Sequence, residues 1–219
     1  MKGHIKPISL AGSELKEIRH VCALFNNEDE EYRVLLPFIK DGFRSGDKAV
    51  HVVNADRQSE HMQRLAAAGI DTAAAQERKQ IDLRTNVDIY LKDGCFDQDR
   101  MVEFFEQLAA SNEGQFKLSR IICRMDWAAD GFTHLDNLIE FESRVNNVWR
   151  GRDDAVICTY HLGQFGGDTV IDVMRTHPLV IIGGILHPNP FFVPPEEFLP
   201  DFRERRGKQT TGDPIFAQL

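Results

Sequence analysis

The chain lacks several short motifs that would each point to an enzyme. It has four cysteines in 219 residues, and none of them form a CxxC pair. Widely spaced cysteines favour free thiols in a reducing compartment over a disulfide framework. There is no GxSxG motif, and no cysteine stands at an expected helix N-terminus, where its pKa would fall. We therefore expect a non-enzymatic protein.

Long hydrophobic runs and an excess of positive charge are also missing. Residues 1–7 contain no apolar stretch of the kind found in signal peptides, and the longest apolar run, 179–186, is too short to span a bilayer. We expect a cytoplasmic protein without membrane contact. The formal charge of −8 comes from 26 Lys and Arg against 34 Asp and Glu. This balance disfavours direct binding to nucleic acid.

A phosphate-binding loop is absent from the place where the sequence pattern would put one. Residues 20–25 are an apolar run typical of a buried strand, and the helix that follows opens with four consecutive carboxylates, 28–31. A P-loop at this junction would supply glycines, a lysine for the phosphates and a Ser or Thr for the metal. The carboxylates suit the helix dipole but repel a triphosphate. The sequence predicts a nucleotide-binding scaffold without the nucleotide chemistry.

Apolar strands alternate with amphipathic helices along the chain. We expect strands at 20–25, 49–54, 81–83, 119–126, 155–160 and 179–186, and helices at 28–44, 56–68, 86–92, 97–111, from 133 or 136 to 149, and 168–176. Such strands are typical of a mostly parallel sheet with helices on both faces, which predicts a three-layer α/β fold. Asn27 and Glu30 form a capping box for the first helix, and Pro37 predicts a bend or break in it.

The composition divides the chain into three parts. Residues 1–19 are a polar lead-in, 20–199 form one α/β domain, and 200–219 are a C-terminal tail with little core to offer. The only dense basic run, 203–206, lies in this tail. We interpret it as a solvated segment and not as a binding arm.

Polar and aromatic residues gather where the expected strands end. In open α/β sheets, ligands bind in the crevice at the carboxyl ends of the strands. The candidate ligand-binding residues at this edge are Asn26, Asn27, Arg124, Asp126, Trp127, Tyr160 and His161. We expect Trp127 and Tyr160 to provide apolar contact and Arg124 to orient a polar group of a small molecule. The alternative is that these residues are polar only because loops are exposed.

Two other chemistries remain as alternatives. The apolar run that ends in Asp126 is similar to a Walker B strand, which leaves a degenerate P-loop-like ATPase open. His20 and Cys22 point to one face of their strand, and Cys158 and His177 lie on two others. Imidazole and thiolate suit zinc, copper(I) or iron, so a metal or thiol redox sensor is also open. Because buried cysteines usually behave as small hydrophobes, a metal is not favoured, and the cofactor stays unassigned.

A series of short motifs, in order over about residues 18–199, resembles a known family. The motifs are His20-Val-Cys-Ala-Leu-Phe25 before the acidic helix start, Pro37-Phe-Ile-Lys-Asp-Gly42 with Gly46-Asp-Lys-Ala-Val50, Tyr90-Leu-Lys-Asp-Gly-Cys-Phe96, Arg120 through Trp127, Glu140-Phe-Glu142, Cys158-Thr-Tyr160, Phe165, His177-Pro178, Gly183-Gly184, Asn189-Pro190 and Pro194-Pro195. They are similar to those of the MEDS sensory domains (methanogen/methylotroph, DcmR-type).

The resemblance implies a RecA/KaiC-like core without the Walker A lysine. It also implies a role in prokaryotic signal transduction, by sensing small one-carbon or hydrocarbon-type compounds. Family members commonly carry a DNA-binding or histidine-kinase module, but the tail after residue 200 is too short for a helix-turn-helix domain. We therefore expect the output, including any control of transcription, to pass through a separate partner, either a kinase or a regulator. Whether the chain also forms a homo-oligomer stays open.

Overall fold

The computed structural model describes residues 7–111, 115–131 and 135–211. The helices, including short 3-10 segments marked η, are α1 (Glu28–Ser45), η1 (Ala55–Arg57), α2 (Gln58–Ala67), α3 (Thr72–Glu77), α4 (Asn86–Ile89), η2 (Lys92–Gly94), α5 (Gln98–Ser111), η3 (Asp126–Asp130), α6 (Leu135–Trp149), η4 (Leu162–Gln164), α7 (Gly167–Thr176) and α8 (Pro195–Thr211). Position 133, one of the two expected starts of the longest helix, lies outside the described residues.

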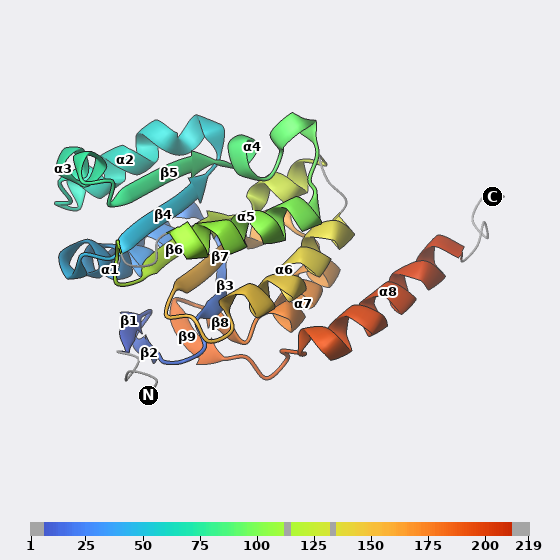
Figure 1. The fold of residues 1–219 in the computed structure, drawn as a ribbon. Helices are drawn as coiled ribbons and strands as arrows, with labels where there is room; N and C mark the ends of the chain where they lie inside the picture. Colours follow the sequence, from blue (N-terminus) through green and yellow to red (C-terminus); the bar gives the residue numbers. More distant parts are fainter. Residues whose placement is uncertain (1–6, 112–114, 132–134, 212–219) are drawn as a thin grey trace.

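Seven strands form the main sheet. They are β3 (His20–Phe25), β4 (Lys48–Val53), β5 (Ile81–Thr85), β6 (Ser119–Arg124), β7 (Ala155–His161), β8 (Leu179–Ile182) and β9 (Ile185–Pro188), in the spatial order β5-β4-β6-β7-β3-β8-β9. Every neighbouring pair is parallel except β8 and β9. The expectation of a mostly parallel sheet is confirmed (Figure 1).

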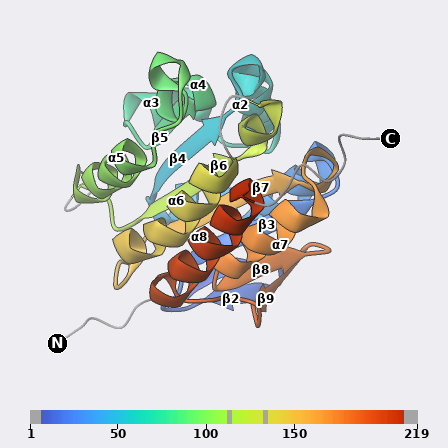
Figure 2. The same ribbon diagram turned by 90° about the vertical axis from the view of Figure 1, so that its right-hand side faces the viewer.

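Helices cover both faces of this sheet. In β3, Val21, Ala23 and Phe25 belong to a core that includes residues of α1, α2 and α3. The alternate residues Cys22 and Leu24 belong to a second core, shared with α5, α6, α7 and α8. Figure 2 looks onto this second face, where α8 packs against α6 and α7. The strands are apolar throughout because both of their faces are buried.

Four expectations about individual elements were wrong. Residues 179–186 are not one strand, because Gly183 and Gly184 both take positive φ, 59° and 78°, and turn the chain into the β8–β9 hairpin. Pro37 does not break α1, which runs continuously from Glu28 to Ser45, and the other expected effect, a bend, stays a prediction. The lead-in is not merely polar, since β1 (Ile8–Leu10) and β2 (Ser13–Leu15) form a hairpin with buried apolar side chains.

The fourth concerns the C-terminal tail. Helix α8 runs across the expected boundary at 199 and 200, and Phe202 is as deeply buried as Phe198. The two rings stack with centroids 5.3 Å apart. The tail therefore contributes to the core, contrary to the expectation. All four cysteines are free thiols, as expected, with Cys22, Cys123 and Cys158 buried in strands and Cys95 exposed.

Candidate functional site

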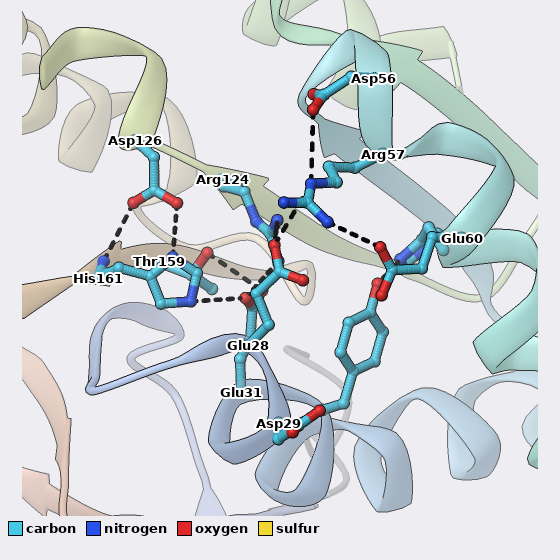
Figure 3. Close-up of polar contacts among 12 residues, drawn as sticks. Glu28, Asp29, Glu31, Asp56, Arg57, Glu60, Arg124, Asp126, Thr159 and His161 are labelled. Carbon is cyan, nitrogen blue, oxygen red and sulfur yellow. Dashed lines mark hydrogen bonds and ion pairs between the residues drawn. The ribbon is translucent and has the colours of Figure 1, made fainter. Parts of the chain in front are cut away.

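A connected set of charged side chains lies at the carboxyl edge of the sheet, between the start of α1 and the ends of β6 and β7 (Figure 3). Arg124, the last residue of β6, donates hydrogen bonds to Glu28 Oε1 at 2.7 Å and to Glu31 Oε2 at 2.6 Å. The His161 ring contacts Glu31 Oε2 through Nε2 at 3.2 Å and Asp126 Oδ2 through Nδ1 at 2.5 Å. We call Glu28, Glu31, Arg124, Asp126 and His161 the edge network.

The edge network holds its histidine in the charged form. Burial lowers the pKa of His161, but hydrogen bonds to Asp126 and Glu31 and the charges of these carboxylates raise it to about 9. Burial would raise the pKa of Glu31, yet His161 and Arg124 lower it below its usual value. Near neutral pH, two cations are thus shared among three carboxylates, and Thr159 Oγ1 adds a hydrogen bond to Glu31 Oε1 at 3.3 Å.

This charged histidine predicts a loss of stability in mild alkali. The pKa of His161 is about 6.5 in an unfolded chain and about 9 here, so its contribution is complete below pH 6.5 and disappears as the pH rises through 9. We expect the free energy of unfolding to fall by about 1–3 kcal/mol over this range. Urea unfolding at pH 6.5, 7.5, 8.5 and 9.5 measures the change. The same slope in His161→Asn would contradict the assignment to this residue.

The start of α1 is closed by its own side chains. Asn27 Oδ1 accepts a hydrogen bond from the Glu30 backbone N–H at 3.0 Å, which confirms the expected N-cap. The Glu30 carboxylate accepts two hydrogen bonds at 2.8 Å, from the backbone N–H and the side-chain amide of Asn26. A surface hollow at this place is lined by Asn26, Asn27, Asp29, Glu30 and Arg33. The backbone N–H groups of Asn26 and Glu30 are therefore already paired, and the others at this helix start lie beside carboxylates that disfavour a phosphate.

We therefore expect Mg-ATP not to bind at the start of α1. Its phosphates would meet the carboxylates of Glu28, Asp29, Glu30 and Glu31, whose charge repels them. Isothermal titration calorimetry should give no saturable binding with a Kd below about 1 mM. Micromolar binding that is weakened by Asn27→Ala would contradict this expectation and favour the ATPase alternative.

Two of the predicted ligand-binding residues lie in the core and not in the edge network. Trp127 is fully buried and stacks on Tyr90, with ring centroids 4.7 Å apart. Tyr160 is also buried, and its hydroxyl donates to Glu142 Oε1 at 2.6 Å. Successive residues of a strand point to opposite faces, so Tyr160 faces α6 while Thr159 and His161 face α1. The contact of Trp127 and Tyr160 with a ligand stays a prediction.

The second candidate set, proposed for a metal, is brought together in part. His20, Cys158 and His177 converge on the other face of the sheet, and Glu142 of α6 lies among them. Their potential ligand atoms are within 4.8 Å of one another, and all four residues are buried. We call these four residues the buried cluster. Cys22 is not part of it, although its Cα is paired with that of Cys158 in the sheet.

Sequence reasoning missed Glu142 and Glu31 as members of these sites. Glu142 shares its buried helical stripe with Leu138, Val145 and Trp149, which recur at spacings of three and four. A carboxylate in an apolar stripe is the signal that could have found it, because an unpaired buried charge is costly. Glu31 carried no such signal, since three acidic neighbours at a helix start are typical of a solvated surface.

Residues 19–178, most of the chain, match the family of the methanogen/methylotroph, DcmR sensory domain, MEDS. No curated protein sequence matches. Among solved structures, the fold is similar to that of the KaiC-like protein PH0186 from Pyrococcus horikoshii OT3, at 13% identity and a TM-score of 0.52, over 75% of this chain and 72% of that one.

A second similar structure is the flagellar accessory protein FlaH from Methanocaldococcus jannaschii. It is 13% identical, with a TM-score of 0.48, over 77% of this chain and 76% of that one.

Among the described residues, none of the helices combines the length and the apolar character that a bilayer crossing needs. The expected RecA/KaiC-like fold is confirmed, and the chain belongs to the MEDS family of sensory domains.

Proposed function

We propose that this protein is a sensor domain that binds a small organic ligand at the carboxyl edge of its sheet. The ligand class is that of one-carbon or hydrocarbon-type compounds, as the family resemblance implies. The signal passes to a separate partner protein, a kinase or a regulator. Membership of a sensory-domain family supports the general role. The edge network is the observation that carries the location.

The edge network suits this role because its side chains join several elements. Arg124 ties β6 to α1, and His161 ties β7 to both α1 and η3. A ligand that competes for one of these charged groups changes the partners of the others. The relative positions of α1 and η3 then respond to the ligand. Binding shifts the population between two arrangements of the same surface, which a partner can read.

The hollow at the start of α1 gives a ligand access to this network. Glu28, Asp29, Glu30 and Glu31 occupy the first turn of the helix; Asp29 and Glu30 line the hollow, and Glu28 and Glu31 belong to the network. Arg33 projects into solvent at the hollow, 75% exposed, with only a 3.9 Å contact to Glu30. A molecule in the hollow therefore lies within one helical turn of the Arg124 ion pairs.

A ligand panel tests the proposal. Short-chain alcohols, methylamines and halocarbons would be titrated into the full chain, with thermal unfolding and two-dimensional amide NMR as readouts. We expect one class to raise the Tm saturably, by mass action, and to shift the amide signals of residues 26–33 and 159–161. No response to any of the three classes would overturn the proposal.

Two matched arginine variants locate the binding. Arg33→Ala removes a side chain of the hollow, whereas Arg78→Ala removes an equally solvent-facing arginine after α3. We expect Arg33→Ala to weaken the binding of the active compound about tenfold and Arg78→Ala to leave it unchanged. Equal affinity in both variants would place the ligand elsewhere and overturn the location.

A further inference from the structure

The buried cluster has a carboxylate at its centre and three potential donors around it. Glu142 Oε2 lies 3.5 Å from His20 Nε2, 3.4 Å from His177 Nε2 and 3.5 Å from Cys158 Sγ. His20 Nε2 and Cys158 Sγ are 3.7 Å apart. The four side chains come from β3, α6, β7 and the residue that directly follows α7. None of the four residues is more than 4% exposed.

Hydrogen bonds outside the cluster determine which nitrogen of each imidazole carries a proton. His20 Nδ1 lies 2.9 Å from Asn146 Oδ1, and the amide nitrogen of Asn146 already donates to three backbone carbonyls. His177 Nδ1 lies 2.9 Å from the carbonyl oxygen of Val173. Both acceptors are oxygens, so each Nδ1 is the donor. The neutral form of each ring then presents a bare Nε2 lone pair to Glu142.

This arrangement is unfavourable unless a cation lies between the groups. His177 Nε2 is completely buried and has no hydrogen-bond partner among the residues that the structure describes. The Glu142 carboxyl group is also completely buried, and its Oε2 faces both Nε2 atoms, at 3.5 Å and 3.4 Å. The Nε2 lone pairs of two imidazoles, a thiol and a carboxyl group therefore face one another in a fully buried space.

We propose that the buried cluster of His20, Glu142, Cys158 and His177 is a binding site for a divalent transition metal ion, with Zn(II) the best fit. Zinc in proteins is tetrahedral, with bonds of about 2.0–2.3 Å to N, O and S ligands, which separates neighbouring ligand atoms by about 3.3–3.6 Å. The four separations given above, 3.4–3.7 Å, are close to this value, and all four ligand atoms lie within 4.8 Å of one another. A mixed N, S and O donor set suits zinc better than magnesium or calcium.

The charges and the surroundings also fit a zinc ion. The +2 charge would be neutralised by the Glu142 carboxylate and the Cys158 thiolate, whose proton passes to solvent on binding. A neutral site suits a fully buried position. Outer contacts orient the ligands: Asn146 and Val173 hold the two imidazoles, and the Tyr160 hydroxyl donates to the second oxygen of Glu142.

The site lies on the α6 face of the sheet, whereas the edge network lies on the α1 face. Cys158 and Tyr160 point toward Glu142 of α6, and Thr159 and His161 point toward Glu31 of α1. The metal site therefore stands independently of the proposed ligand site. A negative result in the ligand panel therefore leaves the metal proposal intact, and a negative metal analysis leaves the ligand proposal intact.

Metal content of the full chain, purified without chelator and loaded with zinc, is the first test. We expect about one equivalent after dialysis, and less than about a tenth of that in Cys158→Ser and Glu142→Gln. Cys22→Ser is the matched control, because Cys22 lies beside Cys158 in the next strand but outside the cluster. It should keep the full equivalent. The proposal would be overturned if the unmodified chain held no zinc, or if the Cys158→Ser variant retained it.

Cobalt(II) provides a test that needs no variant to fold. Loaded into the unmodified protein, it should show the intense visible bands of tetrahedral coordination and a thiolate-to-cobalt charge-transfer band in the near ultraviolet. One equivalent of zinc should remove both. A cobalt spectrum with octahedral bands and no charge transfer would overturn the proposal and leave a proton shared between the imidazoles and Glu142 as the cation.

Discussion

Replacement of Arg120 by alanine is expected to lower the free energy of unfolding by about 3–5 kcal/mol. Arg120 lies in β6 with its side chain 5% exposed, and its guanidinium donates to Asp47 Oδ2 at 2.9 Å and to Asp41 Oδ2 at 2.6 Å. A third hydrogen bond, at 2.6 Å, reaches the carbonyl oxygen of Phe38 in α1. Without the guanidinium, the buried carboxylate of Asp47 has lost its cation.

Urea unfolding followed by circular dichroism measures this loss. Arg84→Ala is the matched control, because Arg84 is also a strand arginine paired with a carboxylate, but it is 44% exposed. Exposed pairs contribute little, so we expect the control to cost less than about 1 kcal/mol. Similar losses in Arg84→Ala and Arg120→Ala would show that burial does not distinguish these two ion pairs.

Gly42 of α1 lies directly against the side chain of Arg120. A Cβ on Gly42 would lie 2.7 Å from Arg120 Cδ, and the guanidinium beyond that atom is held by three hydrogen bonds. Because alanine is normally the better helix residue, Gly42→Ala would be stabilising if this helical position were open. At position 42 the overlap of this Cβ with Arg120 outweighs the gain in helix propensity. Gly42 is therefore required for the close approach of α1 and β6.

Trp127→Ala is expected to destabilise the protein by about 3–5 kcal/mol. The indole ring is fully buried between Tyr90 and Phe96, with centroid distances of 4.7 and 5.2 Å. Removal of the ring leaves a cavity in the core on the α6 face. Trp127→Phe keeps most of the apolar volume and should cost less than about 2 kcal/mol.

Thermal and urea unfolding of both variants, without any ligand, test the position of Trp127. If alanine at this position left the Tm unchanged, the ring would not be a core residue and would be available to line a pocket. A large loss in alanine together with a small one in phenylalanine supports the core position. The two outcomes separate the core role from the ligand contact that the strand-end position predicts.

Much of the fold could be predicted from local pattern. The runs at 20–25, 119–126 and 155–160 predicted parallel strands with both faces buried, and the structure has β3, β6 and β7 there within one or two residues at each end. Asn27 and the acidic turn after it predicted the start of α1 and the absence of a phosphate cradle. Gly183 and Gly184 were visible in the sequence, but their positive φ values were not, and so the hairpin was missed.

The candidate sites were less predictable, because each depends on contacts between distant segments. Arg124, Asp126 and His161 were found because they follow parallel strands, which end at the same edge. Their partners Glu28 and Glu31 lie almost a hundred residues earlier than Arg124, and only the packing of α1 brings them there. Asn26 and Asn27 line the neighbouring hollow and do not join the network.

The sequence alone determined most of the strands and helices between β3 and α7, the acidic junction in place of a P-loop and the family of this chain. These properties depend on local composition and on motifs in order, which do not require knowledge of the neighbours. Only the tertiary structure decided that β3 lies between β7 and β8, which brings His20, Cys158 and His177 together beside Glu142. Successive side chains of a strand point to opposite faces of the sheet, and the tertiary structure decided what covers each face: Tyr160 contacts Glu142 of α6, and His161 contacts Glu31 of α1.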